Sequence, residues 1–266
     1  MANYETLLLD EPAPGIQRIT LNRPDKRNAI NNALRAELLD ALQGAEEDES
    51  VRIHVIRGAG KCFSSGYDLK SDLGADQPFY TPKGIGLQWA KHASAGWMSL
   101  WDLAKPVVAQ VHGYAMAGGL ELVGACDLAY AASNARLSHP VLRVAGLPDF
   151  AWFPALMSPR HAMELHVGGR EYSGDEAAQV GMINQAFPEE ELESRVLDIA
   201  KRICEVPPGV VSVNKRFVYT AMEMRASRAI VRTAADLQNG AHLPSGLTPD
   251  DIKAQVTAAN KARPQS

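Results

Sequence analysis

Apolar and polar residues follow two different rhythms along the first half of the chain. Residues 16–21 and 51–57 have the pattern of strands, and 106–112 form an apolar run typical of a buried strand. Between the first two strands, residues 33–45 place leucines on one helical face and acids on the other. Strands that alternate with amphipathic helices predict an α/β protein with a mainly parallel sheet covered by helices.

The second half changes to helical spacing after a middle stretch without a regular pattern. Residues 73–86 have no period and predict a lid-like loop, and 87–103 predict a helix that ends before Pro106. Residues 113–132 predict a short helix followed by another strand. The later helical segments are 162–167, 174–180, 189–204, 209–224, 226–237 and 249–262.

Composition narrows the class of protein. Among 266 residues, 46% are hydrophobic and 22% are charged, which is typical of a globular chain with a sizeable core. A net charge of −4 argues against nucleic-acid binding. Cys62, Cys126 and Cys204 form no CxxC pair, so neither a disulfide framework nor a cysteine zinc site is expected. Without a signal-like N-terminus or a membrane-length apolar run, we expect a cytoplasmic protein with no membrane association.

Two glycine-bearing loops follow predicted strands, FSSGYDLK at 63–70 and GYAMAGGLEL at 113–122. Neither is a P-loop or a GxGxxG motif. Loops that lead into helices expose backbone N–H groups, and two such loops can hold an oxyanion between them. The alternative is that Gly66, Gly118 and Gly119 only relieve steric strain in tight turns.

The two loops, taken together with LNRPDKRNAI at 21–30 and NARLSHPVLRVAGLP at 134–148, resemble the crotonase, or enoyl-CoA hydratase/isomerase, superfamily. The resemblance implies an α/β spiral of repeated ββα units with a C-terminal helical region. It also implies a homotrimer or dimer of trimers and an acyl-CoA thioester as the small-molecule substrate. On this basis residues 1–200 form a crotonase-like core with CoA-binding and oxyanion loops, and 201–266 complete the site and the trimer contacts.

By position, the resemblance assigns the two oxyanion donors to the backbone N–H groups of Tyr67 and Gly118. A thioester becomes an enolate when its α-carbon loses a proton or its β-carbon is attacked, and two fixed donors stabilise that charge. Lys26 and Arg27 resemble cations of the CoA-binding surface, although a solvated charged turn is the alternative. The resemblance also assigns substrate contacts to Ser65, Gly66, Asp68, Leu69, Gly119, Val141 and Trp152. For Asp68, a cap on the helix after its loop is the favoured alternative.

Glu121, in GGLEL, corresponds to the first of the two catalytic glutamates of the hydratases. We expect this carboxylate to be partly desolvated among Met116, Leu120 and Leu122, as suits an acid/base group. The alternative is a structural acid paired with an arginine.

The second hydratase glutamate is missing, because Val141 follows Pro140. Asp149 stands where hydratases usually have a glycine, and in dienoyl-CoA isomerases, a chlorobenzoyl-CoA dehalogenase and dihydroxynaphthoyl-CoA synthases an aspartate at the corresponding place is catalytic. The resemblance therefore makes Asp149 a candidate second carboxylate, with a polar turn residue as the alternative.

Aromatic residues gather where the family builds its acyl pocket, although we expect about half of them to be core packing. They are Trp89, Trp97, Trp101, Phe150, Trp152 and Phe153. His92 and His139 are interpreted as lone exposed histidines rather than bases.

The leading hypothesis is a 2-enoyl-CoA hydratase that acts through a thioester enolate. The alternatives are an enoyl-CoA or dienoyl-CoA double-bond isomerase that uses Glu121 and Asp149, hydrolysis or carbon–carbon cleavage, and a catalytically silent acyl-CoA binder. The sequence has no metal or redox-cofactor motif, so we expect no separate cofactor and assign coenzyme A as part of the substrate.

Overall fold

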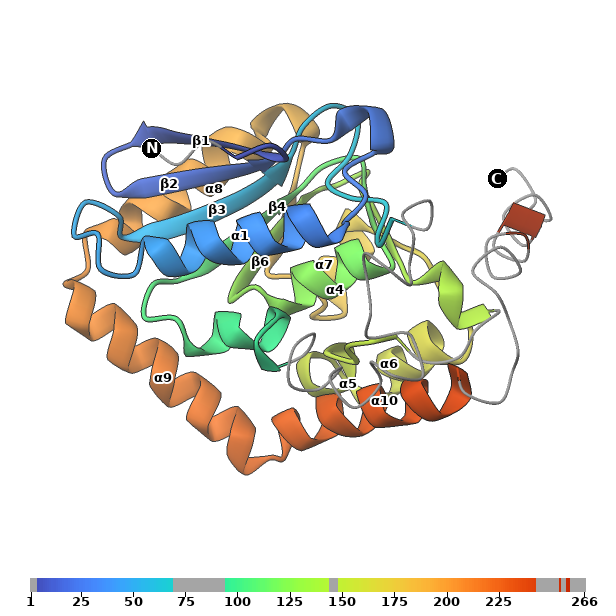
Figure 1. The fold of residues 1–266 in the computed structure, drawn as a ribbon. Coiled ribbons are helices and arrows are strands. Elements are labelled where there is room, and N and C mark those ends of the chain that lie inside the picture. Colours follow the sequence, from blue (N-terminus) through green and yellow to red (C-terminus); the bar gives the residue numbers. More distant parts are fainter. Residues whose placement is uncertain (1–3, 69–93, 144–147, 243–253, 255–256, 259–266) are drawn as a thin grey trace.

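The computed structural model describes residues 4–68, 94–143, 148–242, 254 and 257–258 (Figure 1). Their main sheet has the order β1-β2-β3-β4-β6-β9. Its strands are β1 Leu7–Ala13, β2 Ile16–Leu21, β3 Ile53–Gly58, β4 Val107–Val111, β6 Leu128–Ala132 and β9 Gln185–Phe187. β1 is antiparallel to β2, and every other pair in this sheet is parallel. The predicted parallel α/β sheet is confirmed.

A second, smaller sheet gives the fold its repeated units. It contains β5 Tyr114–Met116, β7 Arg136–Ser138 and β8 Tyr172–Ser173, in the order β5-β7-β8. β4 is followed by β5 and then by helix α4 at Gly118–Ala125, just as β1 and β2 are followed by α1 at Asn32–Gly44. Two strands that follow one another in the sequence therefore precede each of these helices.

Helices cover both faces of the main sheet. α1 begins where the Asn31 side chain accepts a hydrogen bond from the N–H of Leu34, and α8 spans Glu189–Cys204, with Leu192, Val196 and Ala200 buried. Figure 1 shows α1 and α8 on opposite sides of the sheet. The shorter helices are α5 Phe153–Leu156, α6 Pro159–His166 and α7 Gly174–Gln179, and the 3-10 helices are η1 Pro24–Lys26, η4 Trp97–Asp102 and η5 Pro140–Arg143.

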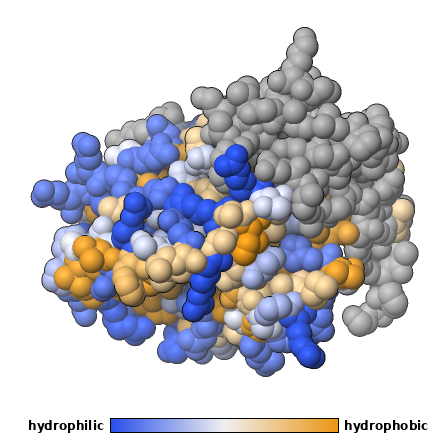
Figure 2. Space-filling model, turned by 90° about the horizontal axis from the view of Figure 1, so that it is seen from below, coloured by the Kyte–Doolittle hydropathy of each residue, from blue (hydrophilic) through white to orange (hydrophobic). Residues whose placement is uncertain are grey.

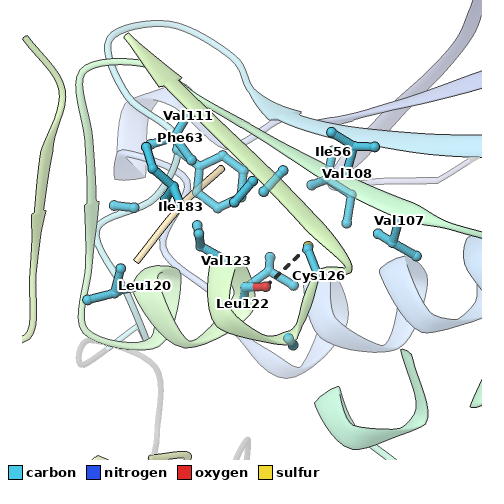
Figure 3. Close-up of a cluster of buried hydrophobic side chains, with 14 of the residues drawn as sticks. Ile56, Phe63, Val107, Val108, Val111, Leu120, Leu122, Val123, Cys126 and Ile183 are labelled. Atoms are coloured by element: carbon cyan, nitrogen blue, oxygen red, sulfur yellow. Dashed lines mark hydrogen bonds between the residues drawn. The ribbon is translucent and has the colours of Figure 1, made fainter. Parts of the chain in front are cut away.

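The core lies between α4 and the main sheet. Figure 3 shows Leu120 and Val123 of α4 facing Phe63 and Val111 across this layer, and all four side chains are buried. At the end of α4, the Cys126 thiol donates to the Leu122 carbonyl at 3.2 Å. The first turn of α4, which includes Gly118 and Glu121, is therefore held in place by close packing against the core.

Helices α9 (Pro208–Met224) and α10 (Ser227–His242) extend along one side of the molecule. A buried ion pair fixes α9 to the core: Lys215 Nζ lies 2.8 Å from Asp127 Oδ2 and also donates to the carbonyls of Leu100 and Lys105. The Tyr219 hydroxyl donates to the other Asp127 oxygen at 2.6 Å. Burial raises the pKa of Asp127, and these two partners oppose that shift.

Several sequence predictions differ from the structure. The end of the predicted 87–103 helix is the 3-10 helix η4, in which Trp97, Met98, Leu100 and Trp101 are all buried. The lid-like loop, the rest of that helix, His92 and Trp89 lie outside the described residues, as does nearly all of 249–262. β1, β5, β7, β8 and β9 were not predicted.

Candidate active site

One buried side chain ties the first two sequence motifs together. Asn28 is fully buried in a left-handed turn with φ of 52°. Its Oδ1 accepts from the Arg23 N–H at 3.0 Å, and its Nδ2 donates to the carbonyls of Ala59 and Cys62, each at 2.9 Å. The turn after β2 is thus fastened to the loop after β3, which leads to Tyr67.

The backbone around Tyr67 is oriented by a short parallel bridge. The Ile30 N–H donates to Gly66 O, and the Asp68 N–H donates to Ile30 O. Both ladder bonds use the neighbours of Tyr67, so the Tyr67 N–H faces away from Ile30. This is the first of the two N–H groups assigned to the oxyanion.

The second N–H group belongs to Gly118, the first residue of α4. The preceding Ala117 has φ of 47° and ψ of −122°, and its N–H donates to Ser138 O at 3.0 Å. An N–H in the first helical turn has no partner within its own helix. A Cβ added to Gly66, whose φ is 95°, would lie 3.1 Å from the Gly118 N. The two loops therefore meet at a point where only glycine fits.

The Tyr67 ring lies directly on Gly118. A Cβ added to Gly118 would meet three ring carbons at 2.7–2.9 Å, so a side chain here would displace the tyrosine. A Cβ added to Gly119 would likewise lie 2.8 Å from the Cβ of Ser64, on the same loop as Tyr67. The first turn of α4 and the Tyr67 loop form one packed unit.

Glu121 is 2% exposed and is held by three donors. Its Oε2 accepts from the Tyr67 hydroxyl at 2.9 Å. Its Oε1 lies 3.0 Å from His139 Nε2 and accepts from the Asp149 N–H at 3.0 Å. The expected desolvation is therefore present, and the partners of the carboxylate among the described residues do not include the arginine of the structural alternative.

Asp149 is buried beside the same group of residues. Burial raises the pKa of Asp149 to about 7, and the Arg35 guanidinium opposes this shift. Burial, together with the charges of Glu121 and Asp149, raises the pKa of the Tyr67 hydroxyl well above its usual value, so the phenol stays protonated. Both carboxyl groups thus act on one tyrosine, and a carboxyl with a pKa near 7 can give or take a proton at neutral pH.

His139 was expected to be exposed, and that expectation is wrong. It follows β7 directly, is 6% exposed and contacts Glu121. The contact joins residues 18 positions apart that lie on different elements. No local sequence pattern predicts this contact. Trp97, one of the aromatic residues expected near the acyl pocket or in the core, contacts the site: its Nε1–H donates to the Tyr67 hydroxyl at 3.1 Å.

The aromatic residues after Asp149 pack as core. Trp152 is fully buried, stacks on Phe150 at 5.8 Å and approaches Trp101 at 5.0 Å. A Cβ on Gly124 would lie 2.7 Å from its ring. Val141, in η5, is half-buried.

The remaining assigned substrate contacts differ in how exposed their side chains are. Lys26 and Arg27 are exposed at the turn after β2, and Ser65 is half-buried on the loop. Asp68 is buried and pairs with Arg23, Nη2 to Oδ2 at 2.9 Å, which gives it a structural partner. Leu69 lies outside the described residues, as does the helix that Asp68 was expected to cap.

The described residues contain neither a cluster of metal ligands nor a membrane-spanning helix. In this part of the chain no three His, Cys, Asp or Glu side chains are grouped as metal ligands. No described helix has the length and apolar character needed to cross a bilayer.

Comparisons with known proteins agree with the fold. The model of the enoyl-CoA hydratase/isomerase family matches residues 11–246. The enoyl-CoA hydratase domain-containing protein 3, mitochondrial, of Danio rerio is 32% identical over 91% of this chain and 82% of its own length. The carnitinyl-CoA dehydratase of Escherichia coli strain K12 is 30% identical over 94% of both chains.

Solved structures give the same result. An enoyl-CoA hydratase/isomerase from Xanthobacter autotrophicus Py2 superposes with a TM-score of 0.87 and 28% identity, covering 98% of this chain and 100% of the other. An enoyl-CoA hydratase from Mycobacterium smegmatis gives 0.81 at 25% identity, covering 98% and 90%. The expected spiral fold is confirmed. The chain belongs to the enoyl-CoA hydratase/isomerase family of the crotonase superfamily, whose members process acyl-CoA thioesters.

Proposed function

We propose that this acyl-CoA-processing enzyme is a 2-enoyl-CoA hydratase, which adds water across the double bond of a thioester and runs the reverse dehydration. The single observation that carries the proposal is Glu121. It is a buried carboxylate on the first turn of α4, three residues after Gly118, and three donors fix its orientation. Two relatives whose names include hydratase and dehydratase support this choice.

The proposed reaction uses the two N–H groups and both carboxyl groups. Glu121 takes a proton from water, and the water oxygen forms a bond to the β-carbon as the electrons of the double bond move to the thioester oxygen. The N–H groups of Tyr67 and Gly118 hold that enolate oxygen. The α-carbon then takes a proton from the Asp149 carboxyl, whose pKa of about 7 keeps it partly protonated at neutral pH. Proton exchange between the two carboxyl groups and solvent restores the enzyme.

A second candidate is double-bond isomerisation, favoured by the same pKa of Asp149. Here one carboxylate removes a proton from one carbon, and the other carboxyl gives a proton to the carbon at the far end of the enolate. No water is added, and the oxyanion donors act as before.

Mass spectrometry of crotonyl, longer enoyl, dienoyl and aromatic CoA thioesters incubated in D₂O separates these functions. A mass gain of one water supports the hydratase, and deuterium uptake without added water supports the isomerase. Glu121→Gln should abolish most turnover and keep CoA-ester binding, whereas Glu190→Gln, on the exposed surface of α8, is the matched control. A wild-type protein that binds the esters and changes none is a silent binder, and the proposal is then wrong.

Binding of the CoA moiety is proposed for the turn after β2. The exposed side chains of Lys26 and Arg27 suit the nucleotide phosphates. Lys26→Ala should raise KM without lowering kcat, and an unchanged KM would remove Lys26 from the binding surface.

We also propose assembly as a homotrimer or dimer of trimers in the cytoplasm, with α9 in the subunit contact. Val210, Val213 and Phe217 are 48%, 67% and 72% exposed and follow one another at helical spacing. Figure 2 views the side that carries α9 and α10 and shows hydrophobic surface among hydrophilic residues. Sedimentation should give a trimer or hexamer, and Phe217→Glu should dissociate it. A monomer in the wild type would contradict this assignment.

A further inference from the structure

The Glu121 carboxylate has an unequal distribution of hydrogen bonds between its two oxygens. Oε1 has two partners, His139 Nε2 and the Asp149 N–H, each at 3.0 Å. Oε2 has one partner among the described residues, the Tyr67 hydroxyl at 2.9 Å. A carboxylate oxygen has two lone pairs, so both of those on Oε1 are occupied and one on Oε2 is open.

The tautomer of His139 follows from its neighbours. An ionised carboxylate only accepts hydrogen bonds, so a ring nitrogen 3.0 Å from Oε1 must carry a proton. The opposite nitrogen, Nδ1, is buried without a partner among the described residues. A second N–H there would be a buried donor without an acceptor, which costs more than an unused lone pair. His139 therefore holds one proton, on Nε2.

We propose that His139 is a positioning residue for catalysis: its Nε2–H fixes Oε1 of Glu121 and thereby leaves Oε2, on the Tyr67 side, as the oxygen that takes the proton from the attacking water. The inference rests on Glu121 as the acid/base group of the proposed function.

The position of Oε2 fits this role. The Tyr67 hydroxyl that contacts Oε2 belongs to the residue whose N–H is assigned to the enolate oxygen, and Trp97 Nε1 holds that hydroxyl at 3.1 Å. The Tyr67 ring also packs on Gly118, which is assigned the other oxyanion donor. Proton transfer at Oε2 therefore takes place beside the oxyanion donors, whereas Oε1 faces the chain segments of His139 and Asp149.

Kinetics of three variants test the role of His139. His139→Leu removes the donor, and kcat should fall roughly tenfold or more while KM stays within about twofold, since a hydrogen bond to a charged group has this magnitude. His139→Gln supplies an amide N–H in place of Nε2–H and should restore most of kcat. His161→Gln makes the same change at a partly exposed histidine of α6 and should alter neither constant. A folded His139→Leu with wild-type kcat would overturn the proposal.

A spectroscopic measurement decides the proposal independently of turnover. In ¹⁵N NMR of histidine-labelled protein, the signals lost in His139→Gln should show a proton on Nε2 and none on Nδ1. A proton on Nδ1 with a bare Nε2 would overturn the assignment. If the wild type converts none of the thioesters, the proposed function fails, and the NMR result still accepts or rejects the Nε2–H contact to Glu121.

Discussion

Replacing Asn28 by alanine should lower the free energy of unfolding and should also lower kcat, because this side chain holds the loop that leads to Tyr67. Three hydrogen bonds converge on this side chain: Arg23 N–H to Oδ1, and Nδ2 to the carbonyls of Ala59 and Cys62. All lie at 2.9–3.0 Å, and the side chain is fully buried. Alanine can replace none of these bonds.

The magnitude follows from two contributions. Three hydrogen bonds at about 1 kcal/mol each give about 3 kcal/mol, because buried groups are left without partners. The φ of 52° adds about 1–2 kcal/mol for alanine, whereas asparagine tolerates the left-handed region. We therefore expect the free energy of unfolding to fall by about 4–5 kcal/mol.

Urea denaturation followed by circular dichroism measures this loss, with Asn28→Gly as the matched variant. Glycine loses the same bonds but adopts positive φ readily, so it should be the less destabilised of the two. Since the Asn28 bonds hold the loop that leads to Tyr67, kcat should also fall in both variants. A loss below about 1 kcal/mol in Asn28→Ala would refute the reasoning.

Three further substitutions test other parts of the structure. Because burial raises the pKa of Asp149 to about 7, the fold loses stability as pH rises from this carboxyl's ordinary value of 3.8 to about 7. Asp149→Asn should therefore raise the free energy of unfolding at about pH 8 by up to about 4 kcal/mol, with little change near pH 4, in urea titrations at both pH values. Lys215→Met leaves Asp127 buried without its cation and should cost about 3–5 kcal/mol in thermal or urea unfolding. Gly124→Ala forces a methyl group to within 2.7 Å of Trp152 and should cost about 1–2 kcal/mol by tryptophan fluorescence in urea.

Each of these outcomes has a contrary result. An equal gain for Asp149→Asn at both pH values would mean that the carboxyl does not titrate as described. Lys201→Met, at an exposed pair with Asp198, should cost less than about 1 kcal/mol, so a similar loss in Lys215→Met would contradict the buried ion pair. A stabilised Gly124→Ala would show that Trp152 can move away.

Strong periodicity made the main elements predictable from the sequence. The strand 16–21 and the helix 189–204 match β2 and α8 residue for residue. α8 buries Leu192, Val196 and Ala200 at helical spacing, and β2 buries its apolar residues Ile16, Ile19 and Leu21. β1 was missed because only Leu7 of its residues is buried, which leaves no alternation to detect. β8 has two residues, too few for any period.

The site was predictable only where a local motif carries it. Gly66, Gly118 and Glu121 stand in motifs, and the structure brings them together. His139 was misjudged because its partner is 18 residues away, and sequence spacing does not encode such contacts. Sequence spacing likewise does not encode the hydrogen bond from Trp97 to the Tyr67 hydroxyl, which joins residues 30 positions apart.

The backbone conformation of Ala117 limits how this enzyme can be made more heat-resistant. It is a non-glycine residue with φ of 47°, and it stands immediately before the N–H of Gly118. A substitution that relaxed this backbone would be an attractive choice for an engineer who selected for melting temperature alone. The same relaxation would free the direction of the first N–H of α4. In the proposed mechanism, thermal tolerance and enolate stabilisation therefore compete at one peptide unit, and directed evolution of this enzyme should screen both together.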